Sequence, residues 1–313
     1  MINMKYQSEN NYWGTLTIGM PVYNDPEGVK KSVSTVFDQT WKGDKQLLII
    51  DDGSTDITPA VIKELQAKYQ GIIQYRNKKN LGRPYSRNRV LEYAQGKILA
   101  WIDAGDIWFP QKLELQFQAL EKHYSDPQPL ICTCPFQWSW IDKGKTDKLM
   151  VPAIEGDQLY NAIKGTLFPY LWTMLGTLES FRSVGGFDEN LPRRQDFDFL
   201  IRFLDGGGKI IAPEINKPLC LYMKTDVGRS GKDVTSSNNI IWRKHKAIYK
   251  RYGWNFALKI RRRQFLLSAR YFKANNNHFY WLKYKLLEKM IALYTNRIFV
   301  KMVSSLKRAA CRK

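Results

Sequence analysis

Short apolar segments alternate with amphipathic segments over the first hundred residues, and this alternation constrains the fold more than any other feature. Residues 46–50 are continuously apolar after Gln46, as in a strand that is buried on both faces. Residues 29–39 repeat apolar side chains every three or four positions, as in a helix. The same two patterns predict strands at 16–23, 72–75 and 98–102 and helices at 58–69 and 84–94. This order predicts an α/β fold with a Rossmann-like sheet flanked by helices.

Three of the predicted strands end in polar loops. The loops are Pro21-Val22-Tyr23-Asn24, Asp51-Asp52-Gly53-Ser54 and Asp103-Ala104-Gly105-Asp106. Aspartate and glycine favour strand-to-helix turns for conformational reasons alone, so a single loop carries little information. The carboxyl ends of parallel strands share one edge of a sheet, however, and open α/β sheets bind their ligands there. The three loops together therefore predict a ligand site at this edge.

The remainder of the chain is less regular. Residues 130–140 and 209–212 are predicted as strands, and residues 195–204 as a helix. Beyond position 239 the sequence predicts basic, aromatic-rich helices with a break at Asn275-Asn276-Asn277. We therefore expect a domain over residues 1–239, followed by a basic helical extension over 240–313.

The positive charge of the chain is concentrated in this extension. The net charge is +20, and residues 240–313 hold 20 of the 49 Lys and Arg residues but only one of the 29 Asp and Glu residues, Glu288. The preceding residues are therefore nearly neutral. Such a division predicts one part that performs chemistry and another that attaches to an anionic partner.

The cysteines and the N-terminal residues indicate a reducing compartment. Cys132, Cys134, Cys220 and Cys311 lack the spacing of a zinc site, and we expect them to be reduced. Residues 1–11 are polar and lack the apolar core of a signal peptide. No apolar run reaches the roughly 18 residues that span a bilayer. These features predict a cytoplasmic protein.

Five segments resemble, in order, the motifs of family 2 glycosyltransferases of the GT-A fold. The segments are residues 18–24, 49–56, 80–88 with 94–97, 102–113, and 185–189 with 194–198. The resemblance covers residues 14–225 and implies an inverting enzyme of the bacterial envelope or polysaccharide type. It also implies that residues 14–115 bind the nucleotide sugar and residues 116–239 bind the acceptor.

The resemblance assigns a donor site to the loops at the sheet edge. Its residues would be Pro21, Tyr23, Asn24, Asp51, Asp52, Arg83, Arg87, Asp103 and Ala104. Asp51 and Asp52 would accept hydrogen bonds from the base and the ribose, and either carboxylate could bind either group. Arg87, or alternatively Arg83, would contact the phosphates, since guanidinium groups suit phosphate oxygens. Arg229, in a glycine-containing loop, is a hypothetical lid residue.

A divalent cation, Mn²⁺ or Mg²⁺, is the expected cofactor. Such a cation neutralises the diphosphate leaving group, and hard cations prefer carboxylate oxygens. The family places two acids one residue apart, whereas here Gly105 takes the second position and the acid follows as Asp106. Asp103 and Asp106 are the predicted ligands. Alternatively, one of them binds the ribose, or Asp106 caps the helix that begins near Pro110.

Asp196 is the predicted catalytic base. Inversion requires a base that deprotonates the acceptor hydroxyl on the face opposite the leaving group. The family often has Glu-Asp where this chain has Gln195 and Asp196. Asp198 would project from a different face of the helix and serve a structural role. The alternative for Asp196 is an exposed first-turn acid that the helix dipole favours.

The basic extension carries apolar residues at helical spacing. One stripe is Leu286, Met290 and Leu293, and an adjacent register holds Leu287, Ile291, Tyr294, Ile298 and Met302. The stripes either pack on the catalytic domain or lie on an anionic membrane surface. Basic residues among aromatics also suit RNA, but no RNA-binding motif is present, so nucleic acid is not an expected partner.

The sequence therefore predicts transfer of a sugar from a nucleotide sugar, with a UDP-sugar favoured, to a hydroxyl acceptor. The acceptor would be a saccharide or a lipid-linked glycan of envelope, capsule or lipopolysaccharide synthesis. The expected location is the inner face of the cell membrane, as a peripheral protein. The alternative is a catalytically silent, glycosyltransferase-like membrane-surface or scaffold protein, which Gly105 and the charge of the extension favour.

Overall fold

The computed structural model describes residues 14–123, 125–140, 145–224 and 230–310, with side chains over 14–123, 125–139, 148–223 and 230–296. The chain divides into two compact units. The first comprises Met1–Asn190 and Gln195–Lys224, and the second comprises Leu191–Arg194 and Thr225–Lys313. The boundary that we expected at 239/240 falls inside helix α8 (Gly231–Arg251), so the second unit begins before it.

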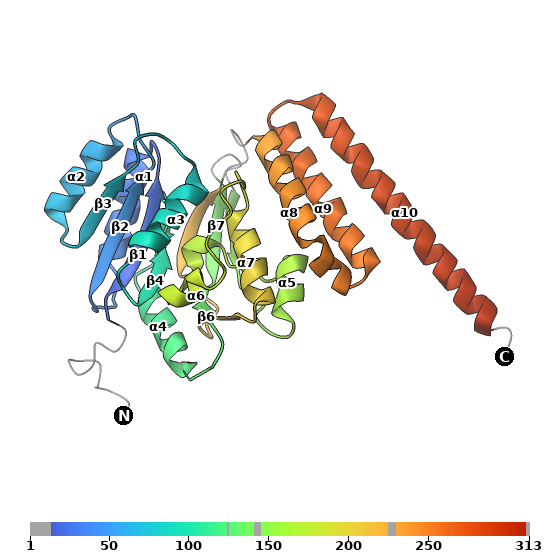
Figure 1. Cartoon of the computed structure of the whole chain (residues 1–313), viewed down its shortest axis with the longest axis horizontal. Helices are drawn as coiled ribbons and strands as arrows, with labels where there is room; N and C mark the ends of the chain where they lie inside the picture. The colour runs from blue at the N-terminus through green and yellow to red at the C-terminus, as the bar shows by residue number, and fades with distance from the viewer. Residues whose placement is uncertain (1–13, 124, 141–144, 225–229, 311–313) are drawn as a thin grey trace. The chain divides into compact units, whose positions relative to one another are not determined.

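The first unit contains a seven-stranded mixed sheet (Figure 1). Its strand order is β10 (Lys209–Ile211), β6 (Leu130–Cys132), β9 (Leu175–Thr177), β4 (Ile98–Trp101), β1 (Leu16–Val22), β2 (Lys45–Asp51) and β3 (Ile72–Arg76). Strand β1 pairs in parallel with β2 and β4, and β2 pairs in parallel with β3. Strand β9 runs antiparallel to β4 and β6. The predicted Rossmann-like sheet is confirmed.

Helices cover both faces of this sheet. Apolar residues of α1 (Pro26–Phe37), α2 (Thr58–Lys68) and α4 (Lys112–Lys122) join the core on one face. Those of α3 (Arg83–Tyr93), α6 (Leu178–Arg182) and α7 (Gln195–Asp205) join the core on the other face. In β2, Leu47 and Ile49 enter the first core, whereas Leu48 and Ile50 enter the second. Burial on both faces explains why this strand is continuously apolar.

A smaller sheet follows the third polar loop. Its order is β5 (Ile107–Trp108), β11 (Cys220–Lys224), β7 (Phe136–Trp140) and β8 (Lys145–Met150). The single strand that we predicted at 130–140 is wrong, because β6 belongs to the larger sheet and β7 to the smaller one. Pro135 lies between them and has no N–H to donate to a ladder, so the chain changes sheets there. A further helix, α5 (Gln158–Lys164), lies in the same unit.

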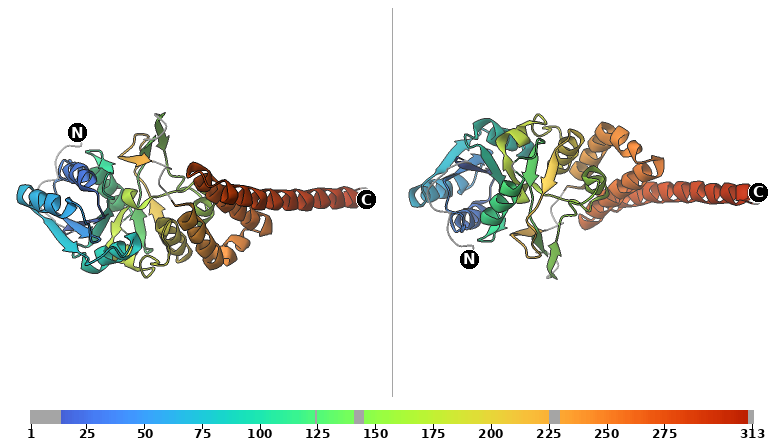
Figure 2. Two further views of the ribbon diagram at one scale, coloured as in Figure 1. Left: turned by 90° about the horizontal axis from the view of Figure 1, so that it is seen from above. Right: turned by 90° about the horizontal axis from the view of Figure 1, so that it is seen from below.

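The second unit consists of long helices. They are α8, α9 (Trp254–Ala274) and α10 (His278–Ala310), with α10 red in Figure 2. The predicted break at 275–277 is confirmed, since α9 ends and α10 begins there. Phe272 of α9 stacks on Tyr284 of α10 at 5.6 Å, and Arg262 pairs with Glu288 at 2.5 Å. Within the described residues, no helix has an apolar stretch long enough to cross a membrane.

Gly19 sets the distance between β1 and α3. A Cβ at this position would lie 2.3 Å from Cγ1 of Val90. We therefore expect Gly19→Ala to lower the free energy of unfolding by about 1–3 kcal/mol through overpacking, measured by urea unfolding. In the Gly19→Ala/Val90→Ala double variant the clash is absent, so its loss should be smaller than the sum of the single losses. Additive losses would contradict this packing argument.

Candidate active site

The register of the larger sheet brings the three polar loops to one edge. Across β1, Val22 pairs with Asp51 and Gly19 pairs with Trp101. The loops that follow β1, β2 and β4 therefore leave the sheet at the same end, as we predicted.

The first two loops are tied together by Asn24. Its backbone N–H donates to Ser54 Oγ at 3.0 Å, and its side-chain oxygen accepts from the Thr55 N–H at 2.8 Å. Its φ of 49° lies in the left-handed region, which asparagine tolerates better than most residues. The neighbouring Tyr23 is exposed, whereas Pro21 is buried inside β1. Tyr23 and Asn24 are thus the residues of this loop that reach the surface of the edge.

Asp51 and Asp52 use their carboxylates to hold the loops. Asp51 accepts from the Ser54 N–H at 2.8 Å and pairs with Arg76 at 3.2 Å. Asp52 accepts from Asn77 Nδ2 and from the Gly82 N–H, both at 2.8 Å. Asp52 thereby connects the loop after β2 to the start of α3. Both carboxylates are buried, so their bonds to the protein fix the shape of the base-binding region that we predicted.

Asp103 is the carboxylate of the third loop that reaches solvent, with 21% of its side chain exposed. Both of its oxygens accept from Arg87 Nη2, at 3.2 and 3.3 Å. Burial opposes its ionisation, but the positive charges of Arg87 and Arg83 outweigh burial and hold the pKa of Asp103 below its ordinary value. Arg83, the exposed first residue of α3, therefore acts electrostatically on this loop. Ala104, also half-buried, follows Asp103 in the turn.

Asp106 has a different environment from Asp103. It is buried, and burial together with the negative charge of Asp103 raises the pKa of Asp106 well above its ordinary value. Its Oδ2 meets no hydrogen-bond partner among the described residues, a state that a neutral carboxyl tolerates better than a charged one. Its backbone N–H donates to the Asp103 carbonyl at 3.1 Å. Asp106 does not cap α4, because the residue at that cap is Gln111.

The third loop does not fit a metal site made by the protein. Gly105 takes the place of the family's second acid and has a φ of 92°, where a side chain would be strained. Its N–H donates to Ser32 Oγ at 2.9 Å, and Ser32 donates to the Asp106 carbonyl at 2.8 Å. In the part of the chain that the structure describes, no three His, Cys, Asp or Glu side chains gather as possible ligands. Asp103 fits as a ligand, whereas the pairing with Asp106 is not supported.

Asp196 lies in the first turn of α7 and is half-buried. Its Oδ1 accepts from the N–H of Phe197 at 2.9 Å. Asp198, in contrast, is fully buried and pairs with Arg202 at 2.9 Å. This agrees with the structural role that we expected for Asp198. The other carboxylate of this turn, Asp196, is therefore the one with access to solvent.

Arg87 connects the third loop to α7. It is only 3% exposed, and while its Nη2 binds Asp103, its Nη1 donates to Gln195 Oε1 at 3.1 Å. Its guanidinium also lies 5.7 Å from the ring centroid of Phe187. Arg87 was predicted as a phosphate contact, but the structure places it beneath the site. There it brings Asp103 and Gln195, the neighbour of Asp196, to either side of one guanidinium group.

Sequence reasoning missed the residues that fasten α3 and α7 to the loop before α7. Asn88 exchanges two hydrogen bonds with Phe187, at 2.8 and 3.0 Å. Arg202, held by Asp198, donates to the carbonyl of Gly186 at 2.7 Å. Asn88 follows Arg87 in one of the motif segments, and this position could have indicated its role. Arg229 lies outside the described residues, so the lid stays a prediction.

Comparison with known proteins agrees with this geometry. The sequence model of "Glycosyl transferase family 2" matches residues 17–166. The uncharacterized glycosyltransferase MJ1057 of Methanocaldococcus jannaschii is 32% identical over 196 residues, which cover 60% of this chain and 63% of that protein. The glucosyltransferase WfgD of Escherichia coli is 35% identical over 108 residues, which cover 34% and 42%. The chain thus spans less than two thirds of each relative.

Two solved structures share the fold at low sequence identity. TarS of S. aureus has a TM-score of 0.59 and 15% identity, covering 80% of this chain and 43% of that one. The mannosyltransferase PcManGT from Pyrobaculum calidifontis has a TM-score of 0.55 and 16% identity, covering 91% and 86%. The strand order, the motif loops at one sheet edge and these two structures together show that the chain has the GT-A fold, and its residues 17–166 match the sequence model of glycosyl transferase family 2.

Proposed function

We propose that the chain transfers a sugar, with inversion, from a nucleoside diphosphate sugar to a hydroxyl group of an acceptor glycan. The observation that carries this proposal is the position of Arg87, which contacts Asp103 on the donor side and Gln195 beside Asp196 on the other. The guanidinium group of Arg87 thus connects the loop of Asp103, proposed to serve the leaving group, to the turn of Asp196, proposed to serve the acceptor. Transfer between two substrates needs both groups held in a fixed relation.

In the proposed reaction Asp196 is the general base. Its carboxylate accepts the proton of the acceptor hydroxyl as the oxygen attacks the anomeric carbon, while the bond from that carbon to the diphosphate breaks. Asp196 is half-buried at the start of a helix, so it is accessible and oriented.

The nucleotide would lie on the loops held by Asp51 and Asp52, against Tyr23 and Asn24. Arg83, exposed beside the third loop, would contact the diphosphate as negative charge develops on it. A divalent cation, Mn²⁺ or Mg²⁺, would bind Asp103, with diphosphate oxygens and water completing its coordination, as is common for Mg²⁺. When bound, it would neutralise the leaving group.

The names of related proteins support a UDP-sugar and a lipid-linked acceptor. WfgD is named for transfer from UDP-Glc to GlcNAc-diphosphoundecaprenol. TarS has been solved with UDP and UDP-GlcNAc, whereas PcManGT has been solved with GDP-Man and Mn²⁺. We therefore propose a UDP-sugar donor and a saccharide or lipid-linked acceptor of envelope synthesis. The alternative, a catalytically silent protein of the same fold, is favoured by Gly105 alone among the site residues.

We further propose that the second unit binds an anionic membrane surface through α10. Five large apolar residues recur on one face of this helix at intervals of three or four. They are Phe279, Leu282, Leu286, Met290 and Leu293, with exposed fractions of 75%, 53%, 52%, 65% and 63%. The opposite face packs on α9 through Tyr284 and Glu288. The exposed face is therefore a second apolar face of α10, and we call it the α10 stripe.

The charges around the α10 stripe suit anionic lipid. Lys283 and Lys289 are exposed beside it. Glu288, the single acidic residue between positions 240 and 313, is buried and paired with Arg262 of α9. An apolar face flanked by lysines and free of exposed acids is typical of helices that lie in a membrane interface. This surface would hold the chain as a peripheral protein on the inner face of the cell membrane, near a lipid-linked acceptor.

Asp196→Asn tests the catalytic base. The substitution keeps the shape but removes the proton acceptor, so turnover should fall at least about 100-fold while UDP binding stays within about twofold. Released UDP and calorimetric titration measure the two quantities. Asp205→Asn, the same change at the far end of α7, is the control and should leave turnover unchanged. Turnover of Asp196→Asn close to that of the wild type would refute the assignment.

The ratio of UDP affinities in Mn²⁺ and in EDTA tests the metal assignment. We expect Asp103→Asn to reduce this ratio at least about tenfold, the size typical of a disturbed metal site. Asp106→Asn should keep the ratio, because Asp106 is buried and an amide replaces the carboxyl group closely in shape. The opposite pattern, with the ratio lost in Asp106→Asn and kept in Asp103→Asn, would reverse the assignment.

Vesicle flotation tests the α10 stripe. In Leu286→Asp/Met290→Asp, binding to phosphatidylglycerol vesicles should fall at least about tenfold, because burying each such side chain contributes about 1.5–3 kcal/mol. Asn255→Asp/Asn296→Asp adds the same charge at other exposed positions and should lose much less binding. Equal flotation of the stripe variant and the wild type would contradict the membrane proposal.

A further inference from the structure

Six aromatic side chains gather on the smaller sheet and on the segment that precedes β9. They are Phe136, Trp138, Phe168, Tyr170, Trp172 and Tyr222. Phe136 and Trp172 are buried, whereas Trp138, Phe168, Tyr170 and Tyr222 are half-buried. The cluster therefore has a buried base and partly exposed outer rings. The proposed chemistry at Asp103 and Asp196 makes no use of it.

Three of these rings form a nearly parallel row. Trp172 lies 5.3 Å from Tyr222 with 17° between the planes, and 5.8 Å from Tyr170 with 2°. Phe136 supports the row from below with its ring nearly perpendicular to Trp172, at 4.9 Å. We call Tyr170, Trp172 and Tyr222 the aromatic row. Because each ring is held by another, their orientations are fixed before any ligand arrives, which lowers the entropy cost of binding.

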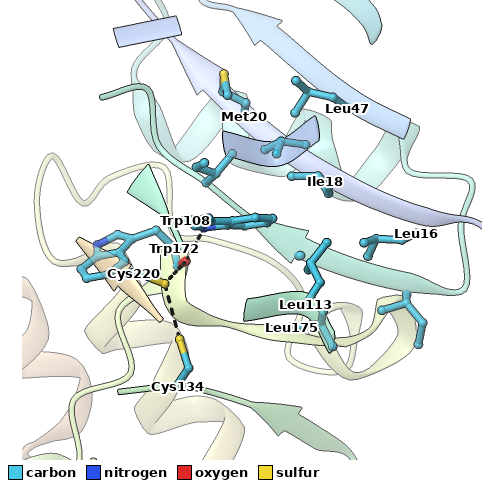
Figure 3. Close-up of a cluster of buried hydrophobic side chains, with 14 of the residues drawn as sticks. Leu16, Ile18, Met20, Leu47, Trp108, Leu113, Cys134, Trp172, Leu175 and Cys220 are labelled. Atoms are coloured by element: carbon cyan, nitrogen blue, oxygen red, sulfur yellow. Dashed lines mark hydrogen bonds between the residues drawn. The ribbon is translucent and has the colours of Figure 1, made fainter. Parts of the chain in front are cut away.

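The aromatic row begins beside the third polar loop. In the pairing of β11 with β5, Cys220 lies opposite Trp108 and Leu221 opposite Ile107. Tyr222 follows Leu221 directly in β11, and Asp106 directly precedes Ile107, so both adjoin this short ladder. Trp108 also donates from Nε1 to the carbonyl of Trp172 at 3.3 Å, as Figure 3 shows.

Trp108, the donor in this hydrogen bond, is held rigidly. Trp108 is fully buried, and the ammonium group of Lys112 lies 3.9 Å from the centroid of its ring. Lys112 is itself fixed by Gln116 at 2.6 Å. The aromatic row is therefore anchored to the strand that directly follows Asp103 and Asp106, and its place next to the donor loop is set by packed side chains.

We infer that the half-buried outer rings of the aromatic row, Tyr170 and Tyr222, with the buried Trp172 as their support, form the binding platform for a pyranose ring of the acceptor glycan. This inference rests on the proposed function. A pyranose presents a face of C–H groups, and the electron-rich faces of aromatic rings attract such partly positive hydrogens. Tyrosine also offers a hydroxyl group to the sugar's own hydroxyls at the rim of the platform. Sites for small polar ligands are commonly lined by aromatic side chains with a few polar groups.

Methyl glycosides of glucose, galactose, mannose and N-acetylglucosamine are suitable probes. We expect at least one of them to bind the UDP-loaded chain and to show saturation transfer from the protein to its ring protons in NMR. Tyr222→Leu, which keeps apolar volume but removes the ring, should weaken that binding at least fivefold. Tyr222→Phe, which keeps the ring, should retain binding within about twofold of the wild type.

Tyr75→Ala is the matched control. Like Tyr222, Tyr75 stacks on an aromatic ring, here that of Tyr93, but it is exposed and lies on β3. Its loss should leave glycoside binding unchanged, and UDP affinity should stay within about twofold in all three variants. If UDP binds but no glycoside binds, or if Tyr222→Leu binds glycoside as the wild type does, the inference is overturned. Failure of UDP itself to bind would instead overturn the proposed function.

Discussion

The buried guanidinium of Arg87 holds the candidate active site together. It contacts both oxygens of Asp103 and the amide oxygen of Gln195, all within 3.3 Å, and is almost fully removed from solvent. An arginine remains charged when buried, so loss of the Asp103 carboxylate would leave that charge uncompensated, at a cost of several kcal/mol. The contact therefore ties the loop after β4 to the first turn of α7. The loop after β4 carries Asp103, proposed to act on the leaving group. The first turn of α7 carries Asp196, proposed to act on the acceptor.

The same arrangement changes how the acidic motif is understood. At Gly105 the backbone has a φ of 92°, which a glycine adopts without strain and an aspartate does not. The carboxyl that follows, Asp106, lies inside the protein beside Asp103, and burial favours its neutral form. Asp103 and the exposed Arg83 are thus the charged groups of this region that reach solvent, while Arg87 lies beneath them.

Sequence patterns predicted the first half of the fold well, because β1, β2 and β4 are buried on one or both faces and their apolar pattern records that burial. They failed at residues 130–140, where an apolar run conceals a change of sheet at Pro135. The motifs predicted one site for Asp103 and Asp196, but they could not show that Arg87 contacts both Asp103 and Gln195. The burial of Arg87 depends on Gln195, 108 residues further along the chain. The aromatic row was equally invisible, since Tyr222 is 50 residues beyond Trp172 in the chain and becomes its neighbour only in the folded protein.

The proposed activity requires that the loops at the edge of the larger sheet bind a nucleotide sugar. Calorimetric titration of the full chain with UDP-, GDP- and dTDP-sugars in the presence of Mn²⁺ tests it most directly. We predict saturable binding of at least one of them, most strongly a UDP-sugar, with a Kd between about 1 μM and 1 mM, the range in which enzymes commonly hold their substrates. Absence of binding to every sugar nucleotide would contradict the account and would favour a catalytically silent protein that keeps only the fold.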